Sequence, residues 1–334
     1  MTAPDPHAGT SRRAHPPARD VERAARRRRA ARVRLIFALA MAVALVVGTT
    51  VAVSAVLTAG PVAEASASTA TPSALVASPA PPQAEALPAP TIVGSSVAAV
   101  DLCADATVTA ELAAGDDAAV IVAAGGPDGL RQGVATGTLP CVSLSDPGHV
   151  WTVVNKTRPF QPVDYEPSPR ELPAGVRSIE GGTLRSDAAA ALSALVAAAA
   201  AEGAGEIALE SGYRSYITQQ NNFGSGGPEV EASVARPGYS EHQSGLAADV
   251  VACDGGGCGT LDDLAATPQG AWTAANAWRF GWIVRYEAGR TDTTGYIPEP
   301  WHLRYIGTEL ARAYHDGGWL SLEEFFGLPA APTY

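Results

Sequence analysis

Two separated stretches constrain the fold of this 334-residue chain more than any other feature. Residues 239–249 place His242 and Asp249 seven positions apart, and His302 follows Glu299 by three positions much later in the chain. Two histidines and one carboxylate are a common ligand set of catalytic zinc sites, which keep a fourth position open for water. We therefore expect a fold that brings both stretches side by side, with Glu299 placed to act on that water.

The other histidines have simpler explanations. His7 and His15 lie in an arginine-rich tail. His149 follows the turn formed by residues 146–148 and is expected on the surface. His315 is expected near the end of a helix, where its charge would interact favourably with the helix dipole.

Three charged residues support the metal hypothesis. Asp249 precedes an apolar run without a turn signal, so its carboxylate should be half-buried and should need a metal ion or an arginine as partner. Glu299 lies between Pro298 and Pro300, which hold the backbone extended and suit a general base with a fixed direction. Arg214 is expected either to pair with a core carboxylate or to bind a substrate carboxylate or a developing oxyanion.

Four short motifs occur in a consistent order over roughly residues 150–310. They are Ser240-x-His242-x-x-Gly245-x-Ala247-x-Asp249, Glu299-x-x-His302, the run Ser211-Gly212-Tyr213-Arg214-Ser215, and Val154-Asn155-Lys156 with its proline-rich sequel. Together they resemble the VanY-type D-alanyl-D-alanine carboxypeptidases, which are zinc peptidases grouped with lysostaphin-like enzymes and the hedgehog signalling domain. No position of these motifs is broken in this chain.

The resemblance implies a role for each matching residue. Three residues would bind zinc: His242, Asp249 and His302. Glu299 would act as general base and then as general acid, and Arg214 would stabilise charge on the substrate carbonyl or anchor the peptide. Three further residues would contact the substrate: Ser240, Gln219 and Tyr213.

The implied reaction is removal of the terminal D-alanine from the stem peptide of peptidoglycan. The main alternative is a peptidoglycan endopeptidase with the same zinc residues; a dipeptidase is less compatible with an exported enzyme. A non-catalytic, zinc-stabilised wall-binding module is disfavoured because Glu299 and Arg214 are both present. A serine-type wall enzyme would need Ser-x-x-Lys, but Val153 stands three positions before the only lysine, Lys156.

The order of the expected elements predicts an α+β fold, because helices and strands alternate without a regular βαβ repeat. We expect a small, mainly antiparallel sheet that carries the zinc site and is flanked by helices, as in hedgehog-like and D,D-peptidase domains. Helices are expected at 108–124, 187–202, 216–223, 268–280 and after a capping box at 321–324. Ser186 and Ser215 are the expected N-caps of the second and third of these helices. Strands are expected at 151–156, 207–209, 250–252, 282–286 and 301–305.

The N-terminal third predicts export. We expect an arginine-rich cytoplasmic tail at 1–34, an uncharged transmembrane anchor at 35–59 and an Ala/Pro/Ser/Thr linker at 60–90. A cysteine-bounded extension at 91–150 and the catalytic domain at 151–327 are expected to follow. A single-pass membrane protein with an extracytoplasmic catalytic domain follows. The alternative is a secreted protein whose signal is cleaved near residues 65–67.

Charge and cysteine content fit an exported body. Beyond the tail the chain carries 13 basic and 31 acidic residues, so a nucleic-acid partner is not expected. We also expect the protein to be a monomer. Cys253 and Cys258 could close a short glycine-rich loop, and Cys103 would then pair with Cys141 by elimination. Four cysteines allow three pairings, and a four-thiolate zinc site is the competing possibility, although exported thiols usually oxidise.

Overall fold

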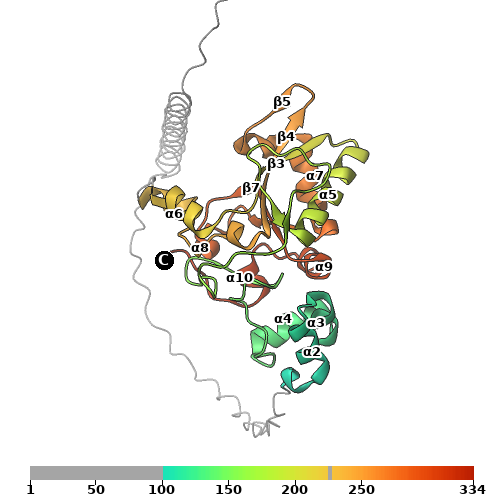
Figure 1. The fold of residues 1–334 in the computed structure, drawn as a ribbon, viewed down its shortest axis with the longest axis vertical. Coiled ribbons are helices and arrows are strands. Elements are labelled where there is room, and N and C mark those ends of the chain that lie inside the picture. Colours follow the sequence, from blue (N-terminus) through green and yellow to red (C-terminus); the bar gives the residue numbers. More distant parts are fainter. Residues whose placement is uncertain (1–100, 225–227) are drawn as a thin grey trace, which may run out of the picture. The chain divides into compact units, whose positions relative to one another are not determined.

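The computed structural model describes residues 101–224 and 228–334, which belong to the compact unit Thr91–Tyr334 (Figure 1). The expected tail, membrane anchor and linker at 1–34, 35–59 and 60–90 lie outside these residues. Among the helices that are described, none is both long and apolar enough to cross a membrane.

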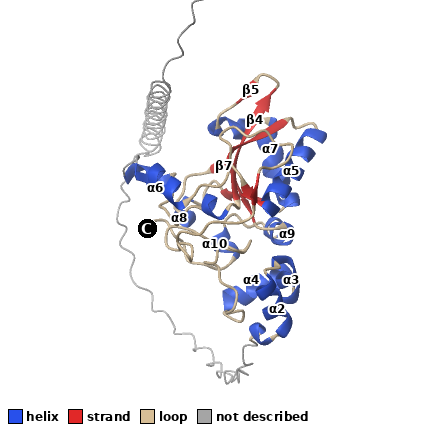
Figure 2. Cartoon of the chain, viewed as in Figure 1, coloured by secondary structure: helices blue, strands red, loops and turns tan. Residues whose placement is uncertain are grey.

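The centre of the fold is a five-stranded antiparallel sheet, which confirms the small, mainly antiparallel sheet that the sequence predicts (Figure 2). Its strands are β3 (Glu206–Ser211), β4 (Ala247–Asp254), β5 (Gly257–Cys258), β6 (Trp282–Tyr286) and β7 (Glu299–Tyr305). The main path runs β3-β4-β7-β6, and β5 pairs with β4. Asp249 on β4 lies directly opposite His302 on β7, so the sheet register itself joins the two stretches that the sequence singles out. Two short strands, β1 (Arg170–Glu171) and β2 (Leu184–Arg185), form a separate ribbon.

Helices α5 (Ser186–Ala201) and α7 (Pro268–Asn276) lie beside the sheet (Figure 1). Leu192 and Leu195 of α5 are fully buried in a cluster with side chains of β3, β4, β6 and β7. Helix α7 begins at a proline, and the Thr267 side chain caps it by accepting from Gly270 N. The 3₁₀ turn η5 (Ala277–Phe280) continues it, so the expected helix 268–280 is present in two pieces.

The remaining helices are short. They are η1 (Leu102–Ala104), α2 (Ala106–Ala114), α3 (Asp117–Ala123), α4 (Gly126–Thr136), α6 (Tyr216–Gly224), η2 (Pro228–Ala232), η3 (Glu241–Ser244), η4 (Leu261–Ala266), α8 (Thr291–Thr294), α9 (Thr308–Asp316) and α10 (Leu322–Phe325). Ser215 and Ser321 cap α6 and α10 as expected, since their hydroxyls accept from Thr218 N and Glu324 N. Ser186 is the first residue of α5 and not its N-cap, which is Arg185.

The expected single helix 108–124 is wrong. Gly115, with φ +71°, ends α2 in the left-handed region, and Asp116 caps α3 through a hydrogen bond from Ala119 N. Helices α2–α4 share a core with the C-terminal helices: Val120 and Leu130 lie in one apolar cluster with residues of α9 and α10. The cysteine-bounded extension is therefore packed directly onto the remainder of the unit.

The expected strand 151–156 is also wrong, although Trp151 and Val153 are fully buried. Val153 N donates to the Leu144 carbonyl, and the Thr152 carbonyl accepts from Arg304, so the backbone groups are satisfied outside any sheet. His149 is likewise not a free surface residue. Its Nδ1 lies 2.6 Å from Asp117 Oδ1, and its ring stacks on Trp151.

Both expected disulfides are confirmed. Cys103 is bonded to Cys141, and Cys253 to Cys258, which leaves no free cysteine among the residues that the structure covers. The first bond joins the start and the end of the extension, and the second closes the turn between β4 and β5. A four-thiolate metal site is therefore excluded.

Candidate metal centre and its surroundings

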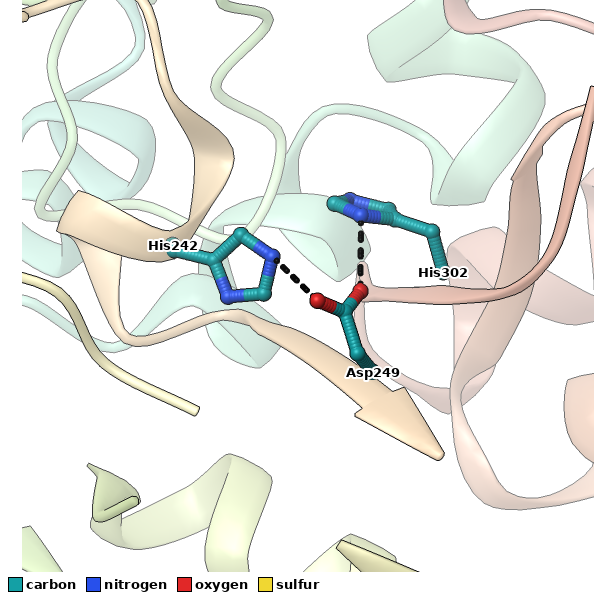
Figure 3. Close-up of side chains that lie close together, drawn as sticks. All are labelled: His242, Asp249 and His302. Atoms are coloured by element: carbon teal, nitrogen blue, oxygen red, sulfur yellow. Dashed lines mark ion pairs between the residues drawn. The ribbon is translucent and has the colours of Figure 1, made fainter. Parts of the chain in front are cut away.

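The structure brings the three expected ligands together in one buried cluster (Figure 3). His242 Nε2 lies 3.2 Å from Asp249 Oδ2, and His302 Nδ1 lies 3.1 Å from Asp249 Oδ1. One nitrogen or oxygen from each residue falls within 4.8 Å of the others. In Figure 3 both imidazole rings point toward the carboxylate that lies between them.

Local structure explains how the two residues of the first stretch converge. His242 lies in η3, and the chain then turns at Gly245 (φ +70°) before β4 begins at Ala247. A Cβ atom on residue 245 would lie 3.0 Å from Arg185 N, so the turn requires glycine for both its conformation and its close packing. The turn lets His242 and Asp249 face the same point.

Hydrogen bonds at the outer nitrogens define which ring nitrogens face the cluster. His242 Nδ1 lies 2.7 Å from the Gly212 carbonyl, which can only accept, so this nitrogen carries the proton. His302 Nε2 lies 3.2 Å from Glu241 Oε2 and donates in the same way. When both rings are neutral, the inner nitrogens, His242 Nε2 and His302 Nδ1, therefore present lone pairs to Asp249.

A cation fits this arrangement. Lone pairs and carboxylate oxygens that face one another repel unless a positive charge lies between them. His242 Nε2 and Asp249 Oδ1 are buried and have no hydrogen-bond partner among the described residues. Imidazole nitrogens and a carboxylate oxygen are ligands that zinc accepts, so these residues fit a zinc ion.

In the metal-free protein a proton takes the place of that cation. Burial lowers the pKa of His302, but its contacts with Asp249 and Glu241 outweigh burial and raise the pKa to about 9. Burial and the nearby Arg214 charge lower the pKa of His242. Burial raises the pKa of Asp249, but the two histidines outweigh it and hold the pKa below its usual range. The carboxylate thus stays ionised for a metal ion.

Glu299 lies at the edge of the cluster. Its Oε2 is 3.7 Å from His302 Nδ1, and the residue is only 7% exposed. Burial raises the pKa of Glu299 to about 7; the His302 charge opposes this shift, whereas the Asp249 charge adds to it. A carboxylate that titrates near neutral pH can both accept and return a proton during a reaction.

Arg214 lies close to the same point. Its backbone N–H donates to the His242 carbonyl, and its charge lowers the pKa of both His242 and Glu299. Its Nε atom is buried and lacks a hydrogen-bond partner within the described part of the chain. The pairing with a core carboxylate that the sequence allows is therefore not seen at this atom.

The three expected substrate contacts differ in what surrounds them. Ser240 is buried at the N-cap position of η3, where its side chain makes no capping hydrogen bond. Gln219 on α6 is buried; its Nε2 donates to the Ala235 carbonyl, and its Oε1 is unpartnered among the residues described. The Tyr213 ring is stacked by the Arg170 guanidinium at 3.9 Å. None of these contacts joins the three side chains directly to the metal cluster.

Sequence reasoning missed the charged residues behind His302. Glu241, Arg285, Arg304 and Glu323 are all buried and form ion pairs with one another. The signal in the sequence is an arginine inside each of the strands β6 and β7, together with a glutamate beside His242. Buried charges of this kind require partners, so an arginine in a strand that should be buried predicts a glutamate near it.

Comparisons with known proteins agree with this geometry. A sequence profile of the VanY family, described as D-alanyl-D-alanine carboxypeptidase, matches residues 181–308. The chain is 37% identical over 193 residues to a putative carboxypeptidase, YodJ, of Bacillus subtilis, which covers 55% of this chain and 69% of that protein. It is 44% identical over 100 residues to a D-alanyl-D-alanine carboxypeptidase of Enterococcus faecalis, which is 29% of this chain and 33% of that enzyme.

Solved structures include one that is similar to this chain over most of its own length. It is the LdcB LD-carboxypeptidase, whose structure was reported to reveal the molecular basis of peptidoglycan recognition. The match has a TM-score of 0.50 and 37% sequence identity, and it covers 54% of this chain and 87% of that one.

Proposed function

Because this chain belongs to the VanY family of D-alanyl-D-alanine carboxypeptidases, we propose that it is a zinc-dependent carboxypeptidase that removes the terminal D-alanine from peptidoglycan stem peptides. The observation that carries this proposal is the buried cluster of His242, Asp249 and His302 beside Glu299. In this cluster His242 Nε2 and Asp249 Oδ1 have no hydrogen-bond partner among the described residues. The Glu299 carboxyl, with a pKa of about 7, lies next to them.

In this proposal His242 Nε2, His302 Nδ1 and one oxygen of Asp249 hold the zinc ion. When bound, zinc polarises the scissile carbonyl and makes water more acidic. Asp249 is already ionised, and each histidine already has its outer nitrogen engaged, so little reorganisation is needed.

Glu299 and Arg214 would act on the reacting groups. Glu299 takes the proton from the attacking water and passes it to the amine of the departing D-alanine. Arg214 has a buried Nε without a described partner and would donate to a substrate oxygen as negative charge develops there. Its flat guanidinium also suits a substrate carboxylate. Ser240, Gln219 and Tyr213 would contact the peptide.

A second candidate is an L,D-carboxypeptidase, which cleaves the bond between an L-residue and a terminal D-alanine. The observation that supports this candidate is the similarity to the LdcB LD-carboxypeptidase, at 37% sequence identity over 87% of that chain. The endopeptidase expected as an alternative uses the same residues. We also propose that residues 35–59 anchor the enzyme in the membrane with its catalytic unit outside the cell, where peptidoglycan is accessible.

The test uses zinc-loaded full-length protein and two synthetic stem peptides. One ends in D-Ala-D-Ala and the other in an L-residue followed by D-alanine. Mass spectrometry should show loss of one alanine from the first peptide, no loss with Glu299→Gln, and normal activity with Glu202→Gln. Glu202 is a matched control because it is an exposed glutamate paired with Arg279.

Loss of alanine from the second peptide alone would replace the D,D-activity by the L,D-activity. Cleavage inside the stem would make the enzyme an endopeptidase. Hydrolysis by Glu299→Gln at the wild-type rate would refute the role of Glu299.

A further inference from the structure

Glu241 is a fully buried carboxylate that contacts a proposed zinc ligand and two arginines. Its side chain has no exposed surface. Oε2 lies 3.2 Å from His302 Nε2, while Oε1 accepts from Arg285 Nε at 2.8 Å and from Arg304 Nη1 at 3.1 Å. Both carboxylate oxygens therefore accept hydrogen bonds, Oε2 from the histidine and Oε1 from the two arginines.

The two arginines are fixed in turn by other segments. Arg285 forms a two-pronged ion pair with Glu323 of α10, with N–O distances of 3.0 and 2.9 Å. Arg304 Nη2 donates to the Thr152 carbonyl at 2.9 Å. Asn155 Nδ2 donates to Glu323 Oε1 at 3.0 Å. These contacts leave little freedom for Glu241 to rotate away from His302.

The acidic and basic groups around Glu241 are equal in number. Two carboxylates, Glu241 and Glu323, face two guanidiniums, Arg285 and Arg304. The two guanidiniums offset the negative charge of Glu241, and Oε2 accepts from His302 Nε2 while Oε1 accepts from the arginines.

We propose that Glu241 is a positioning residue for the metal centre: it holds the His302 proton on Nε2 so that the Nδ1 lone pair faces Asp249 and the metal ion. Arg285 and Arg304 keep Glu241 in place and offset its charge, and Glu323 in turn fixes Arg285. A carboxylate behind a metal-bound histidine fixes the tautomer and the orientation of the ring. The inference rests on the proposed function only in naming zinc as the ion.

The test measures zinc affinity by competition with a chelating dye in the full-length protein, so it does not depend on turnover. Glu241→Gln keeps the size of the side chain and one acceptor oxygen but removes the charge. It should weaken zinc binding about 10- to 100-fold, the usual effect of removing such a partner. Glu323→Gln, which leaves Glu241 in place, should weaken binding less. The surface variant Glu202→Gln should bind zinc as the wild type does.

Near-ultraviolet circular dichroism of the metal-free variants separates this role from a structural one. A folded Glu241→Gln protein with wild-type zinc affinity would overturn the proposal, because a purely structural role changes stability alone. Failure of the wild type to bind zinc would instead overturn the proposed function.

A second measurement holds even where Glu241→Gln does not fold. In the zinc-loaded wild type with ¹⁵N-labelled histidine, NMR should show His302 protonated at Nε2. A proton on His302 Nδ1 would refute the inference.

Discussion

Replacing Glu299 by glutamine should stabilise the metal-free protein at mildly alkaline pH, although it removes the proposed general base. Glu299 is almost fully buried, and among the charged groups near it Asp249 and Glu241 disfavour its ionisation. Glutamine has nearly the same shape as the protonated acid and never ionises. The variant therefore removes the penalty of a buried charge and keeps the packing.

The sign and the size of the effect follow from the pKa of Glu299. That pKa is about 7 in the folded protein, against an ordinary value of 4.5. Between these values the folded state holds a proton that the unfolded state has lost, so stability falls as the pH rises through this range. At about 1.4 kcal/mol for each pH unit, the free energy of unfolding should fall by about 3 kcal/mol.

Urea denaturation of chelator-treated wild type and Glu299→Gln at about pH 5 and about pH 8 measures this directly. Groups remote from Glu299 titrate alike in both proteins, so the difference between the two free energies of unfolding reports Glu299 together with its coupling to His302. That difference should grow by about 2.5 kcal/mol toward the higher pH, with the variant the more stable. A constant difference, or a wild type that is more stable at about pH 8, would refute the reasoning.

Three further predictions concern the metal, the extension and a turn. Zinc at about 100 times its Kd should raise the free energy of unfolding by about 2.7 kcal/mol in the wild type and not in His242→Ala, as thermal unfolding with and without zinc would reveal. Replacing both Cys103 and Cys141 by serine opens a loop that spans 38 positions and should lower the free energy of unfolding by about 4 kcal/mol in urea. Gly281→Ala should cost about 2 kcal/mol in the same assay, because φ is +82° and a Cβ would lie 2.6 Å from the Tyr305 ring; an unchanged midpoint would contradict this.

The sequence predicts two of the three ligands of the metal cluster well because the information for those two is local. His242 and Asp249 are separated by a spacing that a turn at Gly245 converts into proximity, and an apolar run marks the strand that follows. The pairing of this strand, β4, with β7, which carries His302, joins residues that are far apart in the sequence. No pattern within either strand specifies the register, and only the requirement for a shared metal site points to it.

Two local interpretations were wrong for identifiable reasons. The segment 151–156 has the composition of a strand, yet its polar backbone groups are satisfied by Leu144 and Arg304, which no local pattern reveals. The helix expected at 108–124 contains Gly115 followed by Asp116, a combination that ends one helix and caps the next. That signal was present in the sequence, and it outweighs the helix propensity of the alanines on either side.

The most informative contrast in the site is between two buried glutamates on opposite sides of one histidine. Glu241 contacts His302 at Nε2, and Glu299 approaches it at Nδ1. Burial alone would raise the pKa of both carboxyls. Arg285 and Arg304 reverse the shift at Glu241 and hold its pKa below the usual range, whereas Glu299 has no such pair and titrates near 7.

Environments that separate two carboxyl pKa values in this way distinguish a permanent charge from a proton carrier. The guanidiniums therefore make Glu241 suited to fixing the histidine ring, and their absence makes Glu299 suited to moving a proton. Strand β7 contains both His302 and the proton carrier Glu299. The segment η3 contains His242 and, one residue earlier, Glu241, which accepts the His302 hydrogen bond. The two short motifs thus encode the ligands together with the groups that the proposed reaction needs on each side of them.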